Sequence, residues 1–319
     1  MSENEILSKK LFLFVLISIA AIFVIGLIFL LSGYNDFFCE YFYTNDITYL
    51  IFSAISFVGD TTFIILLIVT VWYVYDVKFA KNLALSILGS FYINSLLKDI
   101  IQDPRPWTNI KTGYTDPGFP SGHAQQSVAG YAYLGYEAYR KGKRYISWLF
   151  IILAYLIAIS RVIIGVHDVQ DIWGGLLIGI VWLIFFILLE PKVSEVIGKF
   201  NLITKILLST VIPIVLFIVA ILIFPTSDSD YGLITGGMMG LSLGYVINKE
   251  YINYDPRKIS TKQKVLNFII GIVITLVLYL GLRYIPLDIL GQIWDFIRYF
   301  ILAIILSTIV PWLFTKIQR

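Results

Sequence analysis

Long apolar stretches recur through the 319-residue chain and constrain its fold more than any other feature. A helix needs about 20 mainly apolar residues to cross the hydrocarbon core of a bilayer. Two less apolar segments, 123–139 and 231–248, bring the expected number of spans to ten, and 47–59 is expected as an interfacial helix. The chain is therefore predicted to be an all-α polytopic membrane bundle. The strongly apolar runs are residues 11–31, 61–75, 79–97, 145–164, 172–189, 203–224, 265–285 and 295–314.

Composition agrees with this fold class and excludes others. Hydrophobic residues make up 58% of the chain and charged residues only 14%, whereas soluble domains have about 45–50% and about 25%. These values exclude a water-soluble enzyme, a secreted disulfide scaffold and a disordered protein. With a single cysteine in the chain, an internal disulfide or a thiolate metal site is excluded as well.

The distribution of basic residues predicts the orientation of the spans. If the N-terminus is cytoplasmic, ten spans place most of the 24 lysines and arginines in cytoplasmic segments. Such an excess on the cytoplasmic side is the usual determinant of membrane topology. We therefore expect a multi-pass protein of the cell (plasma) membrane with a cytoplasmic N-terminus.

Four glycines in the weak segment 231–248 follow one another at four-residue spacing, at positions 232, 236, 240 and 244. Residues four apart lie on one face of a helix, and small residues there let transmembrane helices approach closely. We interpret this row of glycines as a helix-packing surface.

Three unusually polar segments are expected at the outer face of the membrane. They are Lys98–Pro106 after the third span, Phe119–His123 at the start of the fourth, and Ser160–Asp171 between the fifth and sixth. Both histidines of the chain lie in these segments. Ionisable groups at the membrane are candidates for function, so the segments together indicate a functional site.

The residue types in these segments suit a phosphate group. Lys98, Arg105 and Arg161 supply cationic donors, and arginine binds phosphate oxygens in a bidentate manner. Ser121 and Gly122 precede a helix, whose N-terminal N–H groups favour an anion, and glycine permits a close approach of the backbone.

The histidines add the groups needed to cleave a phosphoester. His167 and Asp171 are four residues apart and share a helix face, so the carboxylate can orient the imidazole. His123 is then available as a general acid for the leaving oxygen. The pattern indicates phosphoester cleavage without a metal ion, because the sequence shows no cluster of metal-ligating side chains.

These segments contain the three motifs of the type 2 phosphatidic acid phosphatase (PAP2) family of membrane lipid phosphatases, which are Lys-x6-Arg-Pro, Pro-Ser-Gly-His and Ser-Arg-x5-His-x3-Asp. They stand complete and in this order at Lys98–Pro106, Pro120–His123 and Ser160–Asp171. The chain therefore resembles this family over roughly residues 11–190. The resemblance implies a six-span catalytic core in residues 1–190 and a C-terminal membrane extension of about four spans in residues 191–319.

The resemblance also implies a role for each motif residue. His167 attacks phosphorus to give a phosphohistidine, Asp171 orients it, and His123 protonates the leaving group. The phosphoryl oxygens are held by Lys98, Arg105, Ser121, Gly122 and Arg161. No cofactor, metal or nucleic-acid partner is implied. The expected partners are the bilayer and a membrane lipid phosphate, and the oligomeric state is open.

Several alternatives stay open at this stage. A phosphotransferase would use the same phosphohistidine with a hydroxyl acceptor in place of water. A transporter or flippase is less favoured because the sequence shows no internal repeat. Among substrates, a polyprenyl diphosphate is the first expectation. For Asp60, a role as a helix cap is favoured over a role as a partner for a site arginine. Asp99 and Asp103 are interpreted as groups that balance the motif cations.

Overall fold

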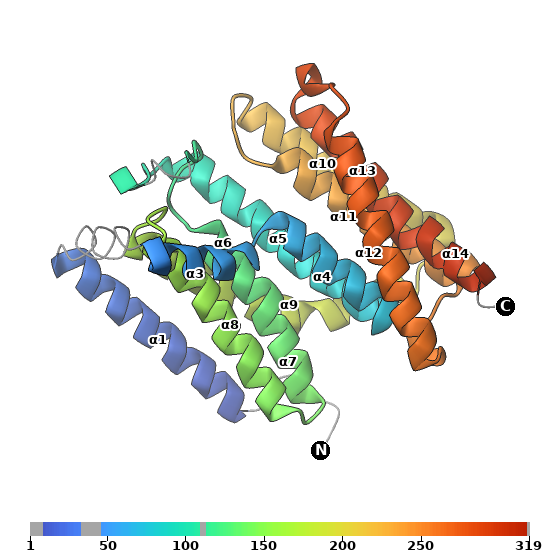
Figure 1. Ribbon diagram of the computed structural model, residues 1–319, viewed down its shortest axis with the longest axis horizontal. Helices are drawn as coiled ribbons and strands as arrows, with labels where there is room; N and C mark the ends of the chain where they lie inside the picture. Colours follow the sequence, from blue (N-terminus) through green and yellow to red (C-terminus); the bar gives the residue numbers. More distant parts are fainter. Residues whose placement is uncertain (1–8, 33–45, 109–112, 318–319) are drawn as a thin grey trace. The chain divides into compact units, whose positions relative to one another are not determined.

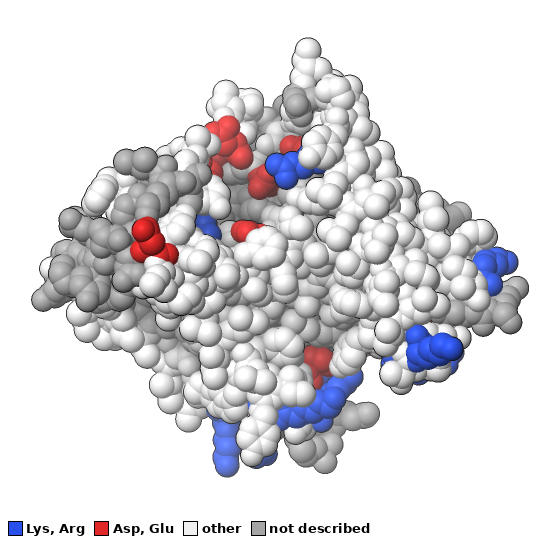
Figure 2. All heavy atoms as spheres, viewed as in Figure 1, with Lys and Arg blue, Asp and Glu red and all other residues white. Residues whose placement is uncertain are grey.

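The computed structural model describes residues 9–32, 46–108 and 113–317, and every regular element in these ranges is a helix (Figure 1). The predicted all-α class is therefore confirmed. Large apolar side chains are exposed along most of the helices, and the face drawn in Figure 2 consists mainly of uncharged atoms. Such a surface is stable against lipid, where helices satisfy their own backbone hydrogen bonds.

Six of the ten expected spans are helices long and apolar enough to cross a membrane. A seventh, at residues 61–75, qualifies if helices α3 (Asp46–Phe57) and α4 (Thr61–Val74) together form one interrupted span. The other three expected spans, at residues 11–31, 123–139 and 231–248, are also helical without meeting the same criterion. The chain is thus a multi-pass membrane protein, and the full count of ten remains a prediction.

The chain divides into two compact units. The first contains residues 1–60 and 93–194, and the second contains residues 61–92 and 195–319. The boundary between residues 190 and 191 that the sequence suggested stays a prediction. The helices within the first unit are α1 (Lys9–Ser32), α3 (Asp46–Phe57), the end of α5 (Val77–Ile101), α6 (Gly122–Ser127), η2 (Val128–Ala132), α7 (Tyr133–Arg140), α8 (Arg144–Ile163) and most of α9 (Val169–Gly198).

Helix α6 continues through η2 into α7, and this segment packs against α8 and α9. The contact with α9 depends on two glycines. A Cβ atom at Gly179 would lie 2.8 Å from the carbonyl oxygen of Gln125, and one at Gly175 would meet the carbonyl oxygen of Ser121. The absence of side chains here lets α9 approach the start of α6 closely, and the first turns of both helices carry motif residues.

The second unit is packed around α11 and α13. Cβ atoms added at Gly232, Gly236, Gly240 and Gly244 would all collide with α13 or η6. The prediction that these glycines form a packing surface is therefore confirmed. The helices of this unit are α4 (Thr61–Val74), the start of α5, α10 (Leu202–Ile223), α11 (Tyr231–Ile247), η3 (Asn248–Ile252), η4 (Pro256–Lys258), α12 (Thr261–Arg283), η5 (Asp288–Leu290), α13 (Gln292–Ile304), η6 (Ile305–Ile309) and α14 (Val310–Ile317).

Candidate active site

All the site residues that the sequence predicted lie in the first unit, at helix ends and in the segments that join them. Hydrogen bonds and close contacts link the three motifs directly. The positions are the last turn of α5 (Lys98), the segment after it (Arg105), the start of α6 (Ser121, Gly122 and His123), the last turn of α8 (Arg161), the α8–α9 connection (His167) and the first turn of α9 (Asp171).

His167 and Asp171 form a buried pair. The Nδ1 atom of His167 lies 2.9 Å from the Oδ2 atom of Asp171, and both side chains are almost completely buried. On the other side of the ring, Arg105 Nη1 lies 3.2 Å from Nε2. Because arginine only donates, Nε2 accepts this hydrogen bond and the proton resides on Nδ1. The imidazole is therefore held as the tautomer whose Nε2 lone pair points toward the cations.

His167 is kept neutral by its surroundings. Burial lowers the pKa of His167 well below its ordinary value, and the positive charges of Arg105, Arg161 and Lys98 lower it further. A neutral imidazole has a lone pair for attack, so the site favours the nucleophilic form over a wide pH range.

His123 belongs to a second histidine–aspartate pair that was missed at the sequence level. Its Nε2 atom lies 2.8 Å from Oδ1 of Asp60, although the two residues are 63 positions apart. Asp60 directly precedes α4, so its interpretation as a helix cap stays a prediction, and the contact with His123 is a further role. Gly59 fits closely beside the ring, since a Cβ atom there would lie 2.9 Å from Cδ2 of His123. Unlike the first pair, this one is partly exposed.

Asp116 balances two of the three predicted cations. It forms an ion pair with Lys98, and its Oδ1 atom accepts a 2.8 Å hydrogen bond from Nη2 of Arg105. Burial disfavours the charged carboxyl, but Lys98 and Arg105 outweigh this effect and hold the pKa of Asp116 below its ordinary value. At Lys98 and Arg105, Asp116 balances the positive charge, the role that the sequence suggested for Asp99 and Asp103. A phosphate bound at these cations would compete with the carboxylate of Asp116.

Arg161 is the most deeply buried of the cations, at 3% exposure. Its Nη1 atom donates to the hydroxyl of Ser56 at 2.6 Å, while its Nε–H finds no acceptor among the described residues. The ring of Tyr114 lies over both arginines, 5.4 Å from the guanidinium of Arg161 and 4.7 Å from that of Arg105. A buried donor without an acceptor is costly, so this N–H suits an oxygen of a ligand.

Ser121 and Gly122 connect the second motif to the third and fix the start of α6. The backbone N–H of Ser121 donates to the carbonyl oxygen of Asp171 at 3.0 Å, and its hydroxyl accepts from the N–H of Ala124 at 3.5 Å. A Cβ atom at Gly122 would lie 3.1 Å from the amide oxygen of Asn94. A side chain at position 122 would therefore press on Asn94 where α5 and α6 come together.

The arrangement joins a buried neutral imidazole, a partly exposed second imidazole and three cations. These are the groups needed to bind a phosphate, attack it and protonate the leaving oxygen. Among the described residues, no group of three or more His, Cys, Asp or Glu side chains is placed to hold a metal ion.

Comparison with known proteins agrees with this chemistry. The PAP2 superfamily model matches residues 79–195, and a second model, the transmembrane extension of PAP2 superfamily phosphatases, matches residues 232–319. Together the two models cover well over half of the chain. The chain therefore belongs to the PAP2 superfamily and is a membrane phosphatase by family.

Similar proteins come from Bacillus subtilis. Phosphatidylglycerophosphatase B of strain 168 is 29% identical over 147 residues, which cover 43% of this chain and 71% of that protein. The crystal structure of a transmembrane PAP2-type phosphatidylglycerolphosphate phosphatase from B. subtilis superimposes with a TM-score of 0.46 at 21% identity, covering 57% of this chain and 98% of the other.

Proposed function

We propose that the protein hydrolyses a lipid phosphate or diphosphate at the extracytoplasmic face of the membrane through a phosphohistidine intermediate, without a metal ion. The observation that carries this proposal is the orientation of His167. Its Nε2 lone pair faces Arg105, and its Nδ1–H is held by a buried carboxylate. An imidazole in this arrangement is prepared to attack an electrophile bound by the cations.

The reaction takes place in two steps. In the first, Nε2 of His167 exchanges its hydrogen bond with Arg105 for a bond to phosphorus, and the bond from phosphorus to the leaving oxygen breaks. His123 gives its proton to that oxygen, while Asp171 stabilises the positive charge that develops on His167. In the second step, water attacks phosphorus and His123 takes a proton from the water. The bond between phosphorus and Nε2 of His167 breaks, so phosphate leaves and Nε2 is free again.

The cations bind the phosphoryl oxygens during both steps. The three cations are neighbours, because Lys98 and Arg105 share Asp116 and the two arginines share the ring of Tyr114. The Nε–H of Arg161 is unsatisfied among the described residues and supplies a further donor. The phosphate displaces the carboxylate of Asp116 from Lys98 and Arg105. Such prepositioned donors stabilise the charge of the transition state.

The side of the membrane follows from the charges of the whole chain. With a cytoplasmic N-terminus, most lysines and arginines fall on the cytoplasmic side, and the three motifs fall on the opposite side. This orientation supports an extracytoplasmic site in the plasma membrane, with a catalytic core in residues 1–190 and a membrane extension in residues 191–319.

Two substrates are proposed within this class. A polyprenyl diphosphate is an example of a carrier lipid that must lose phosphate at the extracytoplasmic face. The name of the B. subtilis relative points instead to phosphatidylglycerol phosphate. Both present a terminal phosphate above a long apolar tail, which fits a cationic site at the end of membrane helices.

A phosphate-release assay tests the proposal. Purified protein in detergent with excess chelator is given phosphatidylglycerol phosphate, a polyprenyl diphosphate and phosphatidic acid in separate reactions. Release of inorganic phosphate from at least one of them is expected, and the fastest identifies the preferred class. No release with or without added metal would contradict the proposal, and release only after metal addition would contradict metal independence. An acceptor alcohol in a parallel reaction detects the transferase alternative as a phosphorylated acceptor.

A further inference from the structure

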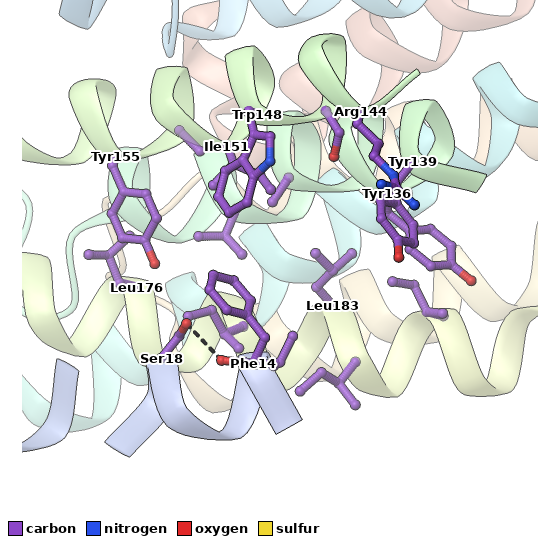
Figure 3. Close-up of a pocket in the computed structure, with 18 of the residues that line it drawn as sticks. Phe14, Ser18, Tyr136, Tyr139, Arg144, Trp148, Ile151, Tyr155, Leu176 and Leu183 are labelled. Atoms are coloured by element: carbon purple, nitrogen blue, oxygen red, sulfur yellow. Dashed lines mark hydrogen bonds between the residues drawn. The ribbon is translucent and has the colours of Figure 1, made fainter. Parts of the chain in front are cut away.

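The first unit contains an apolar cavity that the proposed reaction does not use. The cavity has a volume of about 310 Å³ and lies among α1, α7, α8 and α9, as Figure 3 shows. This volume is at the lower end of the range for ligand pockets, about 300–1,000 Å³, and suits a narrow chain better than a helix of another protein. The lining is mainly aliphatic and aromatic and includes Phe14, Trp148, Ile151, Leu176 and Leu183.

The charged part of the lining lies toward one end of the cavity. Figure 3 places Arg144 beside Tyr136 and Tyr139, while Tyr155 and Leu176 lie toward the other end. Lys10 from the first turn of α1 also contributes to the lining. The cavity therefore has one cationic end, and the hydroxyls of Ser18 and Tyr155 are polar groups of an otherwise apolar lining toward the other end.

The two cations of the lining, Lys10 and Arg144, can bind an anionic ligand. Neither Lys10 nor Arg144 forms an ion pair with any residue in the described ranges. Nearby Lys141 and Arg140, by contrast, are both paired with Glu137, at 3.2 Å and 3.8 Å. An anion at the cationic end of the cavity would therefore meet cations that no described carboxylate neutralises.

This end lies far from the proposed phosphatase site. Arg144 is the first residue of α8 and Arg161 lies in its last turn. A helix of 20 residues is about 30 Å long, which is the thickness of the hydrocarbon core. The cationic end of the cavity therefore lies at the membrane face opposite His167, and a phosphate bound there is out of reach of the nucleophile.

We propose that this cavity binds one anionic phospholipid of the leaflet opposite the catalytic face, with an acyl chain between α1 and α8 and the phosphate at Lys10 and Arg144. A bilayer supplies molecules with this combination of an anionic head and a long apolar chain, and basic side chains at the interface attract them. Tyr136 and Tyr139 line the cavity beside Arg144, and such aromatic rings favour the level where headgroups meet chains.

Native mass spectrometry of the full chain in detergent tests the site. Phosphatidylglycerol and phosphatidylcholine are titrated separately; phosphatidylglycerol carries no phosphate monoester and is not a substrate of the proposed reaction. One tightly retained phosphatidylglycerol is expected, with phosphatidylcholine retained less. Arg144→Gln is expected to weaken phosphatidylglycerol binding about tenfold, which is the loss of one charge-assisted hydrogen bond.

Matched variants separate the cavity from the surrounding surface. Ile151→Trp fills the cavity and is expected to abolish tight binding, whereas Ile152→Trp adds the same ring at the next position, which is exposed and outside the cavity. Lys141→Gln removes a charge at the same end without touching the cavity and is expected to have no effect. Equal retention of the two lipids would overturn the proposal. Equal losses of phosphatidylglycerol binding in Arg144→Gln and Lys141→Gln would overturn it as well. If Ile151→Trp does not fold, Arg144→Gln alone decides it.

Discussion

The two histidine–aspartate pairs of the first unit differ in almost every physical respect. His167 and Asp171 are four residues apart, lie just before and within the first turn of α9, and are 2% and 0% exposed. His123 and Asp60 are 63 residues apart and are 20% and 37% exposed. The first pair is sealed beneath the cations, and the second lies where a leaving group and water can reach it.

This difference matches the two roles in the proposed reaction. A nucleophile benefits from a neutral, fixed ring in a dry environment, which the first pair provides. A general acid must exchange its proton with water in every turnover, which requires the exposure of the second pair. The comparison therefore predicts that changes at the two pairs will differ both in size and in their dependence on substrate and pH.

The largest effect is expected for His167→Ala, which removes the attacking nitrogen. Turnover should fall to the background of the assay, and no phosphorylated protein should be trapped by acid quenching with labelled substrate. In the unaltered protein, the lowered pKa of His167 keeps the ring neutral, so the acid limb of the rate profile should lie below pH 6.5. Surviving turnover in the variant would assign the nucleophile to another residue.

A smaller but still large loss is expected for Asp171→Asn. The amide can donate a hydrogen bond to Nδ1, which moves the imidazole proton to Nε2 and removes the attacking lone pair. Loss of the orienting aspartate in serine proteases lowers kcat about 10⁴-fold, and a fall of about 10³- to 10⁴-fold is expected here. The measurement is kcat with an unchanged thermal unfolding midpoint. A loss of less than tenfold would show that the buried carboxylate does not set the tautomer.

The effect of His123→Ala should depend on the leaving group of the substrate, unlike the effect of His167→Ala. With an alkyl leaving group the variant should lose about 10²- to 10⁴-fold in kcat, because the departing alkoxide is no longer protonated. With nitrophenyl phosphate, whose leaving group needs no proton, most of this loss should disappear. His167→Ala should stay inactive with both substrates. If His123→Ala is equally impaired with the two leaving groups, its role is not that of an acid.

Local patterns in the sequence accounted for much of this site. The apolar runs predicted the helices, the four-residue glycine spacing predicted the face of α11 that packs on α13, and the His167–Asp171 spacing predicted one pair. The helices and the glycine face depend only on helix periodicity, which can be read along a short segment. The spacing gave the right partners for the pair, but the expectation that both residues share a helix face was wrong, because His167 lies before the first residue of α9. The roles of the motif residues came from the resemblance to a known family and remain proposals.

Contacts between distant segments were not predictable in this way. Asp60 reaches His123 because α3 and α6 both pack against α8 in the first unit, and Gly59 leaves room for the ring. Asp116 and Tyr114 lie in a segment with no helical periodicity, so nothing local indicated that they contact the motif arginines. The sequence contained both carboxylates, but their partners are set by the tertiary fold.

The smallest effect is expected for Asp60→Asn, because the carboxylate acts on the reaction only through His123. The cationic form of His123 donates its proton to the leaving group, and Asp60 stabilises that cation by its charge. Without the charge, the proton is lost more easily, so the alkaline limb of the kcat profile should move to lower pH. At neutral pH the expected loss is about tenfold, and it should shrink as the pH falls. Asp60→Glu, which restores the charge, should recover part of the alkaline activity. A uniform loss at every pH, with no recovery in Asp60→Glu, would mean that Asp60 supports the fold rather than the proton transfer.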